Sequence, residues 1–554
     1  MKRRKGSSLL KWENLSRREF LRLSALLGAG AALSACGPTP APTPVPPEPT
    51  ATPVPPEPTA TPVPPVPTAT PVPPTPTPIG PIGTLTIAQS GAFMAMDPYF
   101  DISYPGNSTQ QSICEALIDR EGTPLLAESW ENPDELTWRF HLRKGVKFHN
   151  GDDFTAEAVK FSVERFTDPE NPARRAAHLA AVEKVEIVDD YTIDFTTKEP
   201  ISVLDTQMHD TLILSPRAVK ELGEDIAKSL AGAGTGPFKF VEWVPGEKCV
   251  IEANEDYWGG MPRVKTVIVR PIPEPTVRVT ELKTGGVDLA ADIPPQFISE
   301  IEEAPGVYIE RVTSSRVYEV TINCAEPPFD DVRVRQAFNY AIDKEELCEY
   351  VLFGIATPAA GMLSAPHEGH NPDLKPYPYD PDKARALLAE AGYPDGIKIT
   401  INSPSGRYLQ DKQLAEAIAG QVSEAGIDMT VNVLEWATFL KSIKVDNNGF
   451  LMLMGVWPTH GALVRHLDSR REDYVWYGYH NDEVNALLDK AAATFDPKER
   501  KKVWQEIGKI ARDEAIWAFL ADMQEIWGVS DKVKDFTLRG HGVNPVDHKI
   551  YLAP

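Results

Sequence analysis

The run W-R-F-H-L-R-K-G-V-K-F-H-N-G, from Trp138 to Gly151, says most about the fold of this 554-residue chain. Its first residues, with Thr137, are rich in aromatic side chains and end at a basic turn and a glycine, which is typical of a strand. Phe154-Thr155-Ala156-Glu157-Ala158-Val159 follows and has the residues of a helix start, with Thr155 before the first turn. The stretch therefore predicts a strand, a turn and a helix in succession.

The same alternation of strands and helices continues over the body of the chain, residues 82–554. Strands are predicted where β-branched and aromatic residues are flanked by Gly, Pro or Asp, and helices where apolar residues recur three and four apart. The predicted strands are Leu85–Gln89, Thr137–Leu142, Lys184–Val188, Thr192–Thr196, Phe238–Trp243, Cys249–Ala253, Val264–Arg270 and Tyr318–Asn323. The predicted helices are Thr155–Phe166, Val332–Ala341, Lys344–Leu352, Pro381–Ala391, Gln410–Ala425, Asp482–Thr494 and Pro497–Asp513. This mixture predicts an α/β body in which helices pack on mixed sheets.

Several further motifs stand in a fixed order on both sides of the opening stretch. Together with it they resemble motifs of the extracellular solute-binding proteins of family 5, the peptide/nickel group that serves ABC importers. The resemblance extends over about residues 84–545. The motifs are L-A-E-S-W-E (Leu126–Glu131), G-T-G-P-F (Gly234–Phe238), N-E-D-Y-W (Asn254–Trp258), F-D-D-V-R-V-R-Q-A-F (Phe329–Phe338) and A-I-D-K (Ala341–Lys344).

The resemblance implies an α/β fold of the type II periplasmic-binding-protein kind, in which two lobes joined by crossing strands close around a central ligand cleft. Lobe I would take residues 82–116, 229–300 and 515–554, and lobe II residues 301–514. An extra subdomain of the peptide-binder type would take residues 117–228. The motifs themselves have the residue patterns of strands, turns and helices, so we expect them to form the scaffold. The ligand site has to be sought elsewhere.

The implied function is that of a substrate-binding lipoprotein of an ABC importer, not an enzyme. It would capture an oligopeptide-like solute in the interlobe cleft and deliver it to a membrane permease, and we expect it to be a monomer. Two alternatives stay open. The same fold could bind a non-peptide solute such as an oligosaccharide or a metal chelate, or it could act as a sensor without a transporter.

One departure from the family bears on the ligand. In peptide-binding relatives, a tryptophan in lobe II is followed three residues later by an aspartate that pairs with the peptide α-ammonium. The matching stretch here has Trp457 at the first position and His460 at the second. A buried ammonium needs a carboxylate, because a bare buried charge costs several kcal/mol. Either the anchor has moved, with Asp468 and Glu435 as candidates, or the ligand has no free α-amine there.

Trp457 and His460 follow an apolar strand-like run, Phe450–Met454, and strand ends commonly deliver ligand contacts in α/β sheets. We therefore expect both side chains in the cleft. The full set of expected ligand-binding residues is Trp457, His460, Asn323, Tyr318, Ser90, Phe93 and Glu435.

The first 36 residues predict export and a lipid anchor. Arg17 and Arg18 precede a short uncharged stretch, which resembles a twin-arginine signal peptide. The stretch is shorter than the roughly 20 apolar residues of a membrane span. Leu33-Ser34-Ala35-Cys36-Gly37 resembles a lipobox, so Cys36 is the expected lipidation site. The protein would then be held on the outer face of the cytoplasmic membrane, at the cell surface or in the periplasm.

Residues 37–81 predict a disordered, proline-rich tether. The unit T-P-V-P-P-x-P-T-A recurs at Thr52–Ala60 and Thr61–Ala69. Proline fixes φ and lacks an N–H, so the segment can form neither a helix nor the interior of a sheet. A semi-rigid polyproline II spacer reaches about 3.1 Å per residue, or roughly 130 Å in all. It would hold the body away from the membrane. An SH3-type ligand is the weaker alternative.

Charge and composition exclude several other functions. The chain carries a net charge of −23, and residues 1–36 hold eight basic and two acidic side chains, so the remainder is near −29. That charge argues against nucleic acid as a partner. The glycine-rich run Gly232–Pro237 leads into a strand, not a helix, so it fails as a dinucleotide site. His367 and His370 stand in a loop without the spacing of a zinc site. We predict no cofactor and no metal.

Four cysteines remain beyond Cys36, namely Cys114, Cys249, Cys324 and Cys348. No C-x-x-C pair occurs among them, which disfavours zinc and thioredoxin-like chemistry. One or two disulfides and buried free thiols both stay open.

Overall fold

The computed structural model of the chain describes residues 80–101, 103–405, 407–436, 438–439, 442, 451–456, 467–470 and 478–553. All of them belong to the unit Pro76–Pro554. The predicted lipidation site Cys36, residues 37–79 of the predicted tether, Trp457 and His460 lie outside these residues. No helix in the described part of the chain is both long enough and apolar enough to cross a membrane.

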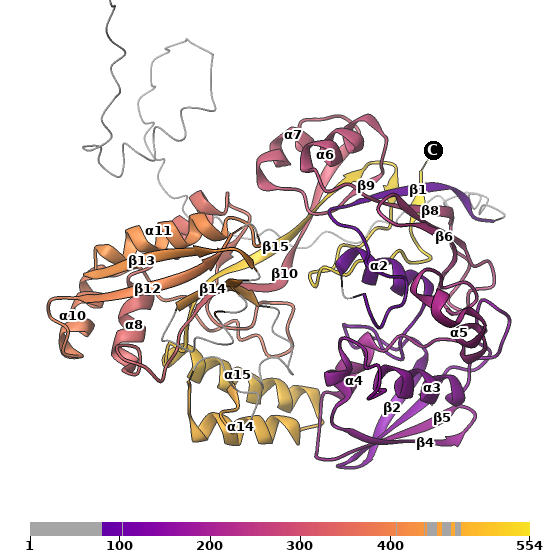
Figure 1. Cartoon of the computed structure of the whole chain (residues 1–554), viewed down its shortest axis with the longest axis horizontal. Coiled ribbons are helices and arrows are strands. Elements are labelled where there is room, and N and C mark those ends of the chain that lie inside the picture. The colour runs from indigo at the N-terminus through magenta and orange to yellow at the C-terminus, as the bar shows by residue number, and fades with distance from the viewer. Residues whose placement is uncertain are drawn as a thin grey trace, which may run out of the picture. The chain divides into compact units, whose positions relative to one another are not determined.

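The described residues form strands and helices that alternate along the chain (Figure 1). The strands are β1 (Ile82–Gln89), β2 (Ala127–Asp134), β3 (Thr137–Leu142), β4 (Val182–Asp189), β5 (Thr192–Thr197), β6 (Phe238–Val244), β7 (Lys248–Ala253), β8 (Val264–Pro271), β9 (Leu289–Ala290), β10 (Val307–Thr321), β11 (Thr357–Pro358), β12 (Ile397–Pro404), β13 (Ile427–Leu434), β14 (Leu451–Val456), β15 (Trp517–Ser530), β16 (Val533–Lys534) and β17 (Tyr551–Leu552). The α-helices are α2 (Tyr104–Ile113), α3 (Ala156–Phe166), α4 (Leu204–Gln207), α5 (Pro216–Leu222), α6 (Pro275–Thr284), α7 (Ile298–Glu302), α8 (Val332–Tyr340), α9 (Lys344–Glu346), α10 (Pro381–Glu390), α11 (Asp411–Ser423), α14 (Asp482–Ala492) and α15 (Pro497–Asp513). Short 3₁₀ segments are Ala176–Leu179, Met208–Asp210, Gly223–Ala227 and Pro295–Phe297.

Two long antiparallel strands, β10 and β15, connect the two halves of the body. They pair from Val307 opposite Ser530 to Thr321 opposite Trp517. In the largest sheet of the described residues, β14, β12 and β13 continue beyond β10, while β9, β1, β8, β7 and β6 continue beyond β15. Figure 1 shows β10 and β15 running from the orange half to the purple half. This is the crossing-strand arrangement that the resemblance implied.

A bulge interrupts the pairing of β10 and β15 near the middle of the two strands. Thr313 pairs with Gln524 and Val317 pairs with Asp522, so three residues of β10 face one residue of β15. A bulge bends its strand and redirects side chains, and such bulges are frequent next to functional sites. The residues that it redirects, Ser314–Arg316, belong to the candidate site.

The opening stretch of the sequence forms β3 of a second, antiparallel sheet, in the order β2-β3-β5-β4. Phe140 and Leu142 are buried on this sheet and belong to one apolar core that also contains Leu85 and Ile87 of β1. A second core joins Val317 and Val320 of β10 to the helices of the other half. The β2–β5 sheet therefore shares its core with the half that contains β1.

The glycine-rich run leads into a strand, as predicted, since β6 begins at Phe238. Its glycines serve close packing. A Cβ on Gly234 would lie 2.0 Å from the backbone oxygen of Ile113, at the end of α2. Because no side chain fits at such a distance, glycine is required where this loop crosses the helix.

Most predicted elements lie within a few residues of their predicted positions. Thr137–Leu142 and Pro497–Asp513 have the predicted bounds. The predicted strand Tyr318–Asn323 is the end of the longer β10, which stops at Thr321. The predicted helix Lys344–Leu352 is α9 followed by a π-helical turn, Leu347–Val351.

The structure shows the environment of the four cysteines and of His370, which the sequence analysis considered as disulfide or metal-site candidates. Cys114, Cys249, Cys324 and Cys348 are buried free thiols, which decides the question of disulfides among them. The imidazole of His370 contacts the Leu363 carbonyl at 2.9 Å. No group of three or more His, Cys, Asp or Glu in the described part of the chain is placed to hold a metal ion.

Candidate ligand-binding site

A cavity of about 480 Å³ lies where the strand ends of one half meet the crossing strands and a loop of the other half. Pockets for small ligands range over roughly 300–1,000 Å³, so the space suits a small solute. Its wall includes Gln89 and Ser90 at the end of β1, Ala291–Pro295 after β9, Ser314, Arg316 and Tyr318 at the bulge, Arg407–Leu409 after β12, and Met523–Trp527 of β15. Tyr104, the first residue of α2, also lines the cavity, as do Ile355 and Gly542.

The ends of the parallel strands β1 and β9 deliver two polar side chains to the cavity, as α/β sheets commonly do. Asp292 follows β9 in a left-handed backbone conformation, with φ of 50°. Aspartate tolerates this region better than most side chains. The hydroxyl of Ser90 donates a hydrogen bond to the Asp292 carboxylate.

Arg278 of α6 fixes the backbone beneath Asp292. Its side chain is 2% exposed, and its guanidinium donates hydrogen bonds to the carbonyls of Ile272, Pro273, Ala291 and Asp292 at 2.7–3.1 Å. A buried arginine is tolerated because these carbonyls satisfy its donors. Arg278 thus ties the end of β8 to the end of β9.

The bulge of β10 brings Ser314 and Arg316 against Glu525 of β15. The Ser314 hydroxyl donates to Glu525 Oε1 at 3.0 Å, and it accepts a hydrogen bond from the Arg316 backbone N–H at 3.1 Å. Burial and, after it, the Asp292 carboxylate raise the pKa of Glu525 to about 7, while Arg316 and the hydrogen bond from Ser314 act in the opposite direction. Arg316 Nη2 lies 3.5 Å from the Tyr104 hydroxyl.

The loop after β12 contributes a guanidinium from the other half. The Leu409 backbone N–H donates to the Tyr318 hydroxyl at 3.0 Å, which holds this loop against β10. The Arg407 guanidinium lies 5.1 Å from the ring centre of Trp436 and 5.5 Å from that of Tyr408. Arg407 is exposed and makes no ion pair with any described carboxylate. It is therefore available to an anionic group in the cavity.

The structure places two of the predicted ligand-binding residues, Ser90 and Tyr318, on the cavity wall. Phe93 lies instead in the core of the first half, where it stacks on Trp243 at 6.1 Å between ring centres. Asn323 is buried beyond the end of β10, and its Oδ1 accepts a hydrogen bond from the Ala325 backbone N–H. Glu435 is exposed and is not among the residues that line the cavity.

Asp468, the other candidate anchor, is buried and bonds to Arg470 at 2.8 Å, away from the cavity wall. The roles of Trp457 and His460 stay predictions. β14 ends at Val456, which pairs with Val317 of β10. Val456, the residue before Trp457, is therefore paired with the sequence neighbour of Tyr318, and Tyr318 is a residue of the cavity wall.

Sequence reasoning missed several polar residues of the cavity wall, among them Asp292, Arg316, Arg407, Gln524 and Glu525. Arg407 lies between predicted elements, in the loop sequence S-P-S-G-R-Y. A charged residue in such a turn-rich loop could have indicated a binding residue, because binding residues are often on loops. Asp292 and Glu525 carried no local signal, because they come together only through the pairing of β9 with β15.

Comparison with known proteins agrees with this architecture. The pattern of the family described as bacterial extracellular solute-binding proteins, family 5 Middle, matches residues 121–462. The glutathione-binding protein GsiB of Pectobacterium atrosepticum is 28% identical over 478 residues, which are 83% of this chain and 92% of that protein. The periplasmic binding protein DppA of Helicobacter pylori, solved with the peptide STSA, is 27% identical with a TM-score of 0.68, over 85% of this chain and 98% of its own. AgaA of A. tumefaciens R10, solved with agropinic acid, is 25% identical with a TM-score of 0.68, over 85% and 99%.

The chain belongs to the bacterial extracellular solute-binding proteins of family 5. Its fold is the type II periplasmic-binding-protein fold, as the resemblance implied. Proteins of this family bind solutes for ABC importers, are exported to the periplasm or the cell surface, and are not enzymes.

Proposed function

We propose that this protein captures an oligopeptide-like solute in the 480 Å³ cavity and delivers it to the permease of an ABC importer. The observation that supports this most directly is the wall of the cavity, which combines guanidinium groups of Arg316 and Arg407 with carboxyl groups of Asp292 and Glu525. A short peptide carries both charges and many hydrogen-bonding groups. Arg407 is suited to a ligand carboxylate, because a guanidinium binds carboxylates in two-pronged geometry.

The relatives support a small, peptide-like ligand. GsiB is named for glutathione, a modified tripeptide, and DppA was solved with a tetrapeptide. AgaA was solved with agropinic acid, which keeps a non-peptide solute open as the second candidate. A sensor without a transporter is the remaining alternative. We further propose that Cys36 carries the lipid anchor, that the proline-rich tether spaces a monomeric body from the membrane, and that the lobes and the extra subdomain have the predicted boundaries.

Two measurements test the proposed ligand class. Mass spectrometry of the solute released from denatured, freshly purified protein should identify a peptide or a peptide-like compound. Calorimetry should then show binding of at least one member of a panel that contains reduced glutathione, dipeptides, tripeptides and tetrapeptides. Binding of none of them, or release of a solute without amide bonds, would contradict the peptide class.

The Arg407→Met variant tests the role of the guanidinium. It should bind the best ligand of the panel at least tenfold more weakly, since a hydrogen bond to a charged group contributes about 1.5–3 kcal/mol and 1.4 kcal/mol is a factor of ten. Arg311→Met is the matched control, because Arg311 is an exposed residue of β10 whose guanidinium pairs with Glu302 at 2.9 Å. Its affinity should match that of the wild type.

A further inference from the structure

The charged side chains of the cavity wall come from different parts of the fold. The two carboxyl groups stand on neighbouring strands of the crossing region, Asp292 after β9 and Glu525 on β15. Arg407 is on the loop after β12, in the other half. Arg316 stands on the bulge of β10, which pairs with β15. The wall therefore offers two carboxyl groups in the crossing region, with Arg316 beside Glu525, and across the cavity the Arg407 guanidinium, which makes no ion pair with a described carboxylate.

The acidic side of the wall has acceptor atoms that no described donor satisfies. Glu525 Oε1 accepts from Ser314, whereas the structure shows no donor for Glu525 Oε2 in the described part of the chain. Gln524, its neighbour on the cavity wall, has a buried side-chain Oε1 without a hydrogen-bond partner among the described residues. A buried acceptor is usually satisfied, so Gln524 Oε1 indicates a ligand that brings a donor, and Glu525 Oε2 offers that donor group a second acceptor on the same wall.

The charge of Asp292 also disfavours the ionised form of Glu525. Asp292 contributes to the raised pKa of Glu525, after burial. A cationic group between them would offset both effects, because an opposite charge nearby favours the ionised carboxyl. An ammonium has three donors and no acceptor, which fits the carboxylate and amide acceptors of Asp292, Gln524 and Glu525 on this side of the wall.

We propose that Asp292 and Glu525 bind the cationic amine of a zwitterionic ligand, with its carboxylate toward Arg407. This inference rests on the proposed function and adds the orientation of the ligand to it. It also names residues that could bind the ligand ammonium in this chain, which has His460 at the position of the family aspartate. The anchor would lie on the crossing strands instead of on the loop after β14.

Asp292→Asn and Glu525→Gln test the proposal, with calorimetry on the purified full chain. The probes are reduced glutathione, trialanine and their N-acetylated forms. Asparagine tolerates the left-handed conformation of Asp292, so this variant should keep the backbone of the loop. Each variant should bind the free-amine probe at least tenfold more weakly than the wild type does. N-acetylation should weaken binding to the wild type by a similar factor.

A thermodynamic cycle that combines the Asp292→Asn variant with N-acetylation of the probe distinguishes loss of amine recognition from general damage to the site. Because Asp292→Asn and N-acetylation would remove the same contact, their effects should overlap, so the variant should distinguish the two probes by less than threefold. Asp531→Asn, which removes an exposed carboxylate beyond the end of β15, is the matched control and should bind like the wild type. If the Asp292 and Glu525 variants lose affinity for both probes equally, the carboxylates do not recognise the amine and the proposal is overturned.

Two other outcomes are distinguishable from each other. If the wild type binds a free-amine probe and neither variant changes its affinity, the peptide function stands and the amine site is wrong. If the wild type binds neither free-amine probe while the released solute lacks an amine, both the peptide class and the amine site are wrong.

Discussion

At the scale of single residues, Asp522 is a carboxyl group held in unfavourable surroundings. It lies on β15, one residue from the ligand cavity, and lines a second cavity of about 270 Å³ beside His370 and Gly508. Its Oδ1 is buried without a hydrogen-bond partner in the described part of the chain. Burial raises the pKa of Asp522 from 3.8 to about 7.

This raised pKa predicts how stability depends on pH. Between about pH 4 and pH 7 the folded state holds a proton on Asp522 that the unfolded state has released, so its contribution to stability is full below pH 4 and is lost as pH rises through 7. Asp522→Asn should therefore raise the free energy of unfolding by on the order of 2 kcal/mol at pH 8 and by little at pH 4.5. Urea unfolding at both pH values measures the difference, with Asp531→Asn as the control. An equal effect at both pH values would contradict this account.

The candidate site shows which residues sequence reasoning can find. Ser90 and Tyr318 were predicted, because each belongs to or follows a strand with a clear pattern. Arg316 was not, since only the register of β10 against β15 reveals the bulge that redirects it. Asp292 and Glu525 are separated by more than 200 residues, and one sequence holds no signal that pairs them. The predictions for Trp457 and His460 rest on the family motif and on the strand-like run that precedes them.

At the scale of elements, the predicted helices lie close to their expected positions, whereas the helices α2 and α6 and several strands were not predicted. The carboxylate of Asp496 caps α15 by accepting from the N–H groups of Lys498 and Glu499, which is the start that Asp-Pro predicted. β15 was missed because it is buried on both faces and shows no alternation of apolar and polar residues. β2 was missed because A-E-S-W-E-N-P-D contains Asn, Pro and Asp, which favour turns.

The junction of β8, α6 and β9 depends on one side chain, Arg278. Arg278→Met should lower the free energy of unfolding by on the order of 2–4 kcal/mol, because it leaves four buried or half-buried carbonyls without their donors. Denaturant unfolding followed by circular dichroism measures the loss. The control is Arg270→Met on β8, since Arg270 makes a half-exposed ion pair with Glu281 at 3.0 Å and should cost less than about 1 kcal/mol. Equal losses in the two variants would refute the role of the carbonyl contacts.

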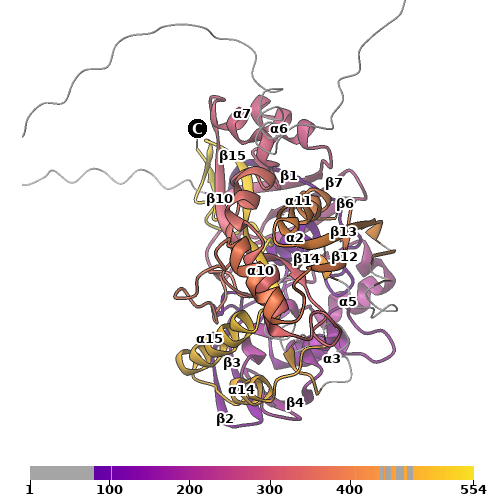
Figure 2. The same ribbon diagram turned by 90° about the vertical axis from the view of Figure 1, so that its left-hand side faces the viewer.

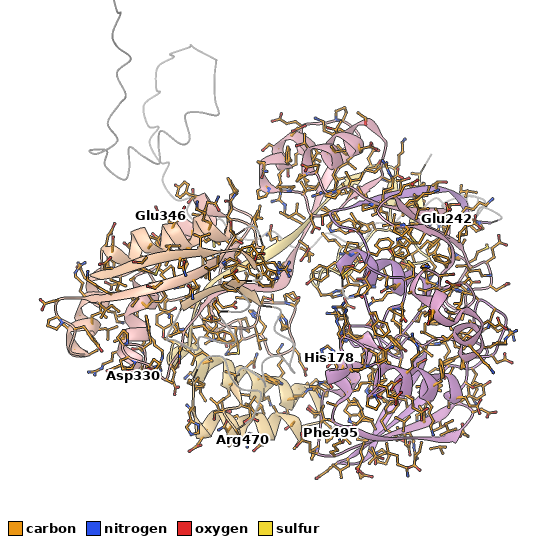
Figure 3. The ribbon with its side chains drawn as sticks, in the orientation of Figure 1. His178, Glu242, Asp330, Glu346, Arg470 and Phe495 are labelled. Atoms are coloured by element: carbon orange, nitrogen blue, oxygen red, sulfur yellow. The ribbon has the colours of Figure 1, made fainter. Side chains whose placement is uncertain are left out.

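At the scale of the whole molecule, a second contact joins the two halves away from the crossing strands. Figures 1 and 2 show the pair α14–α15 beside the sheet β2–β5, and Figure 3 labels Phe495 between these two helices. The Ser202 hydroxyl donates to the Ala491 carbonyl at 2.6 Å, and the Arg500 guanidinium donates to the Ser202 carbonyl at 2.5 Å. Arg500 is 3% exposed and also pairs with Glu368 at 3.1 Å.

Phe495 adds an aromatic contact to this junction, because its ring lies 5.7 Å from the ring of the buried Trp138. A ligand that contacts both halves prefers the conformation in which they are together, so contacts that stabilise this conformation raise the apparent affinity. We therefore expect the Phe495 ring to affect ligand affinity, although Phe495 is not a residue of the cavity wall.

Phe495→Ala should weaken ligand binding two- to tenfold, since an aromatic pair contributes about 0.5–1.5 kcal/mol beyond its buried area. Small-angle scattering of the body without the tether should give a smaller radius with ligand than without it in the wild type. The variant should reach that smaller radius only at a higher ligand concentration. Tyr340→Ala is the control, because the Tyr340–Tyr377 pair at 5.0 Å lies within one half and its loss should lower stability without changing affinity. If the Phe495→Ala protein binds ligand with wild-type affinity, the contact between α14–α15 and the β2–β5 sheet is present equally with and without ligand. The preference for the closed conformation then comes only from contacts of the ligand and from the crossing strands.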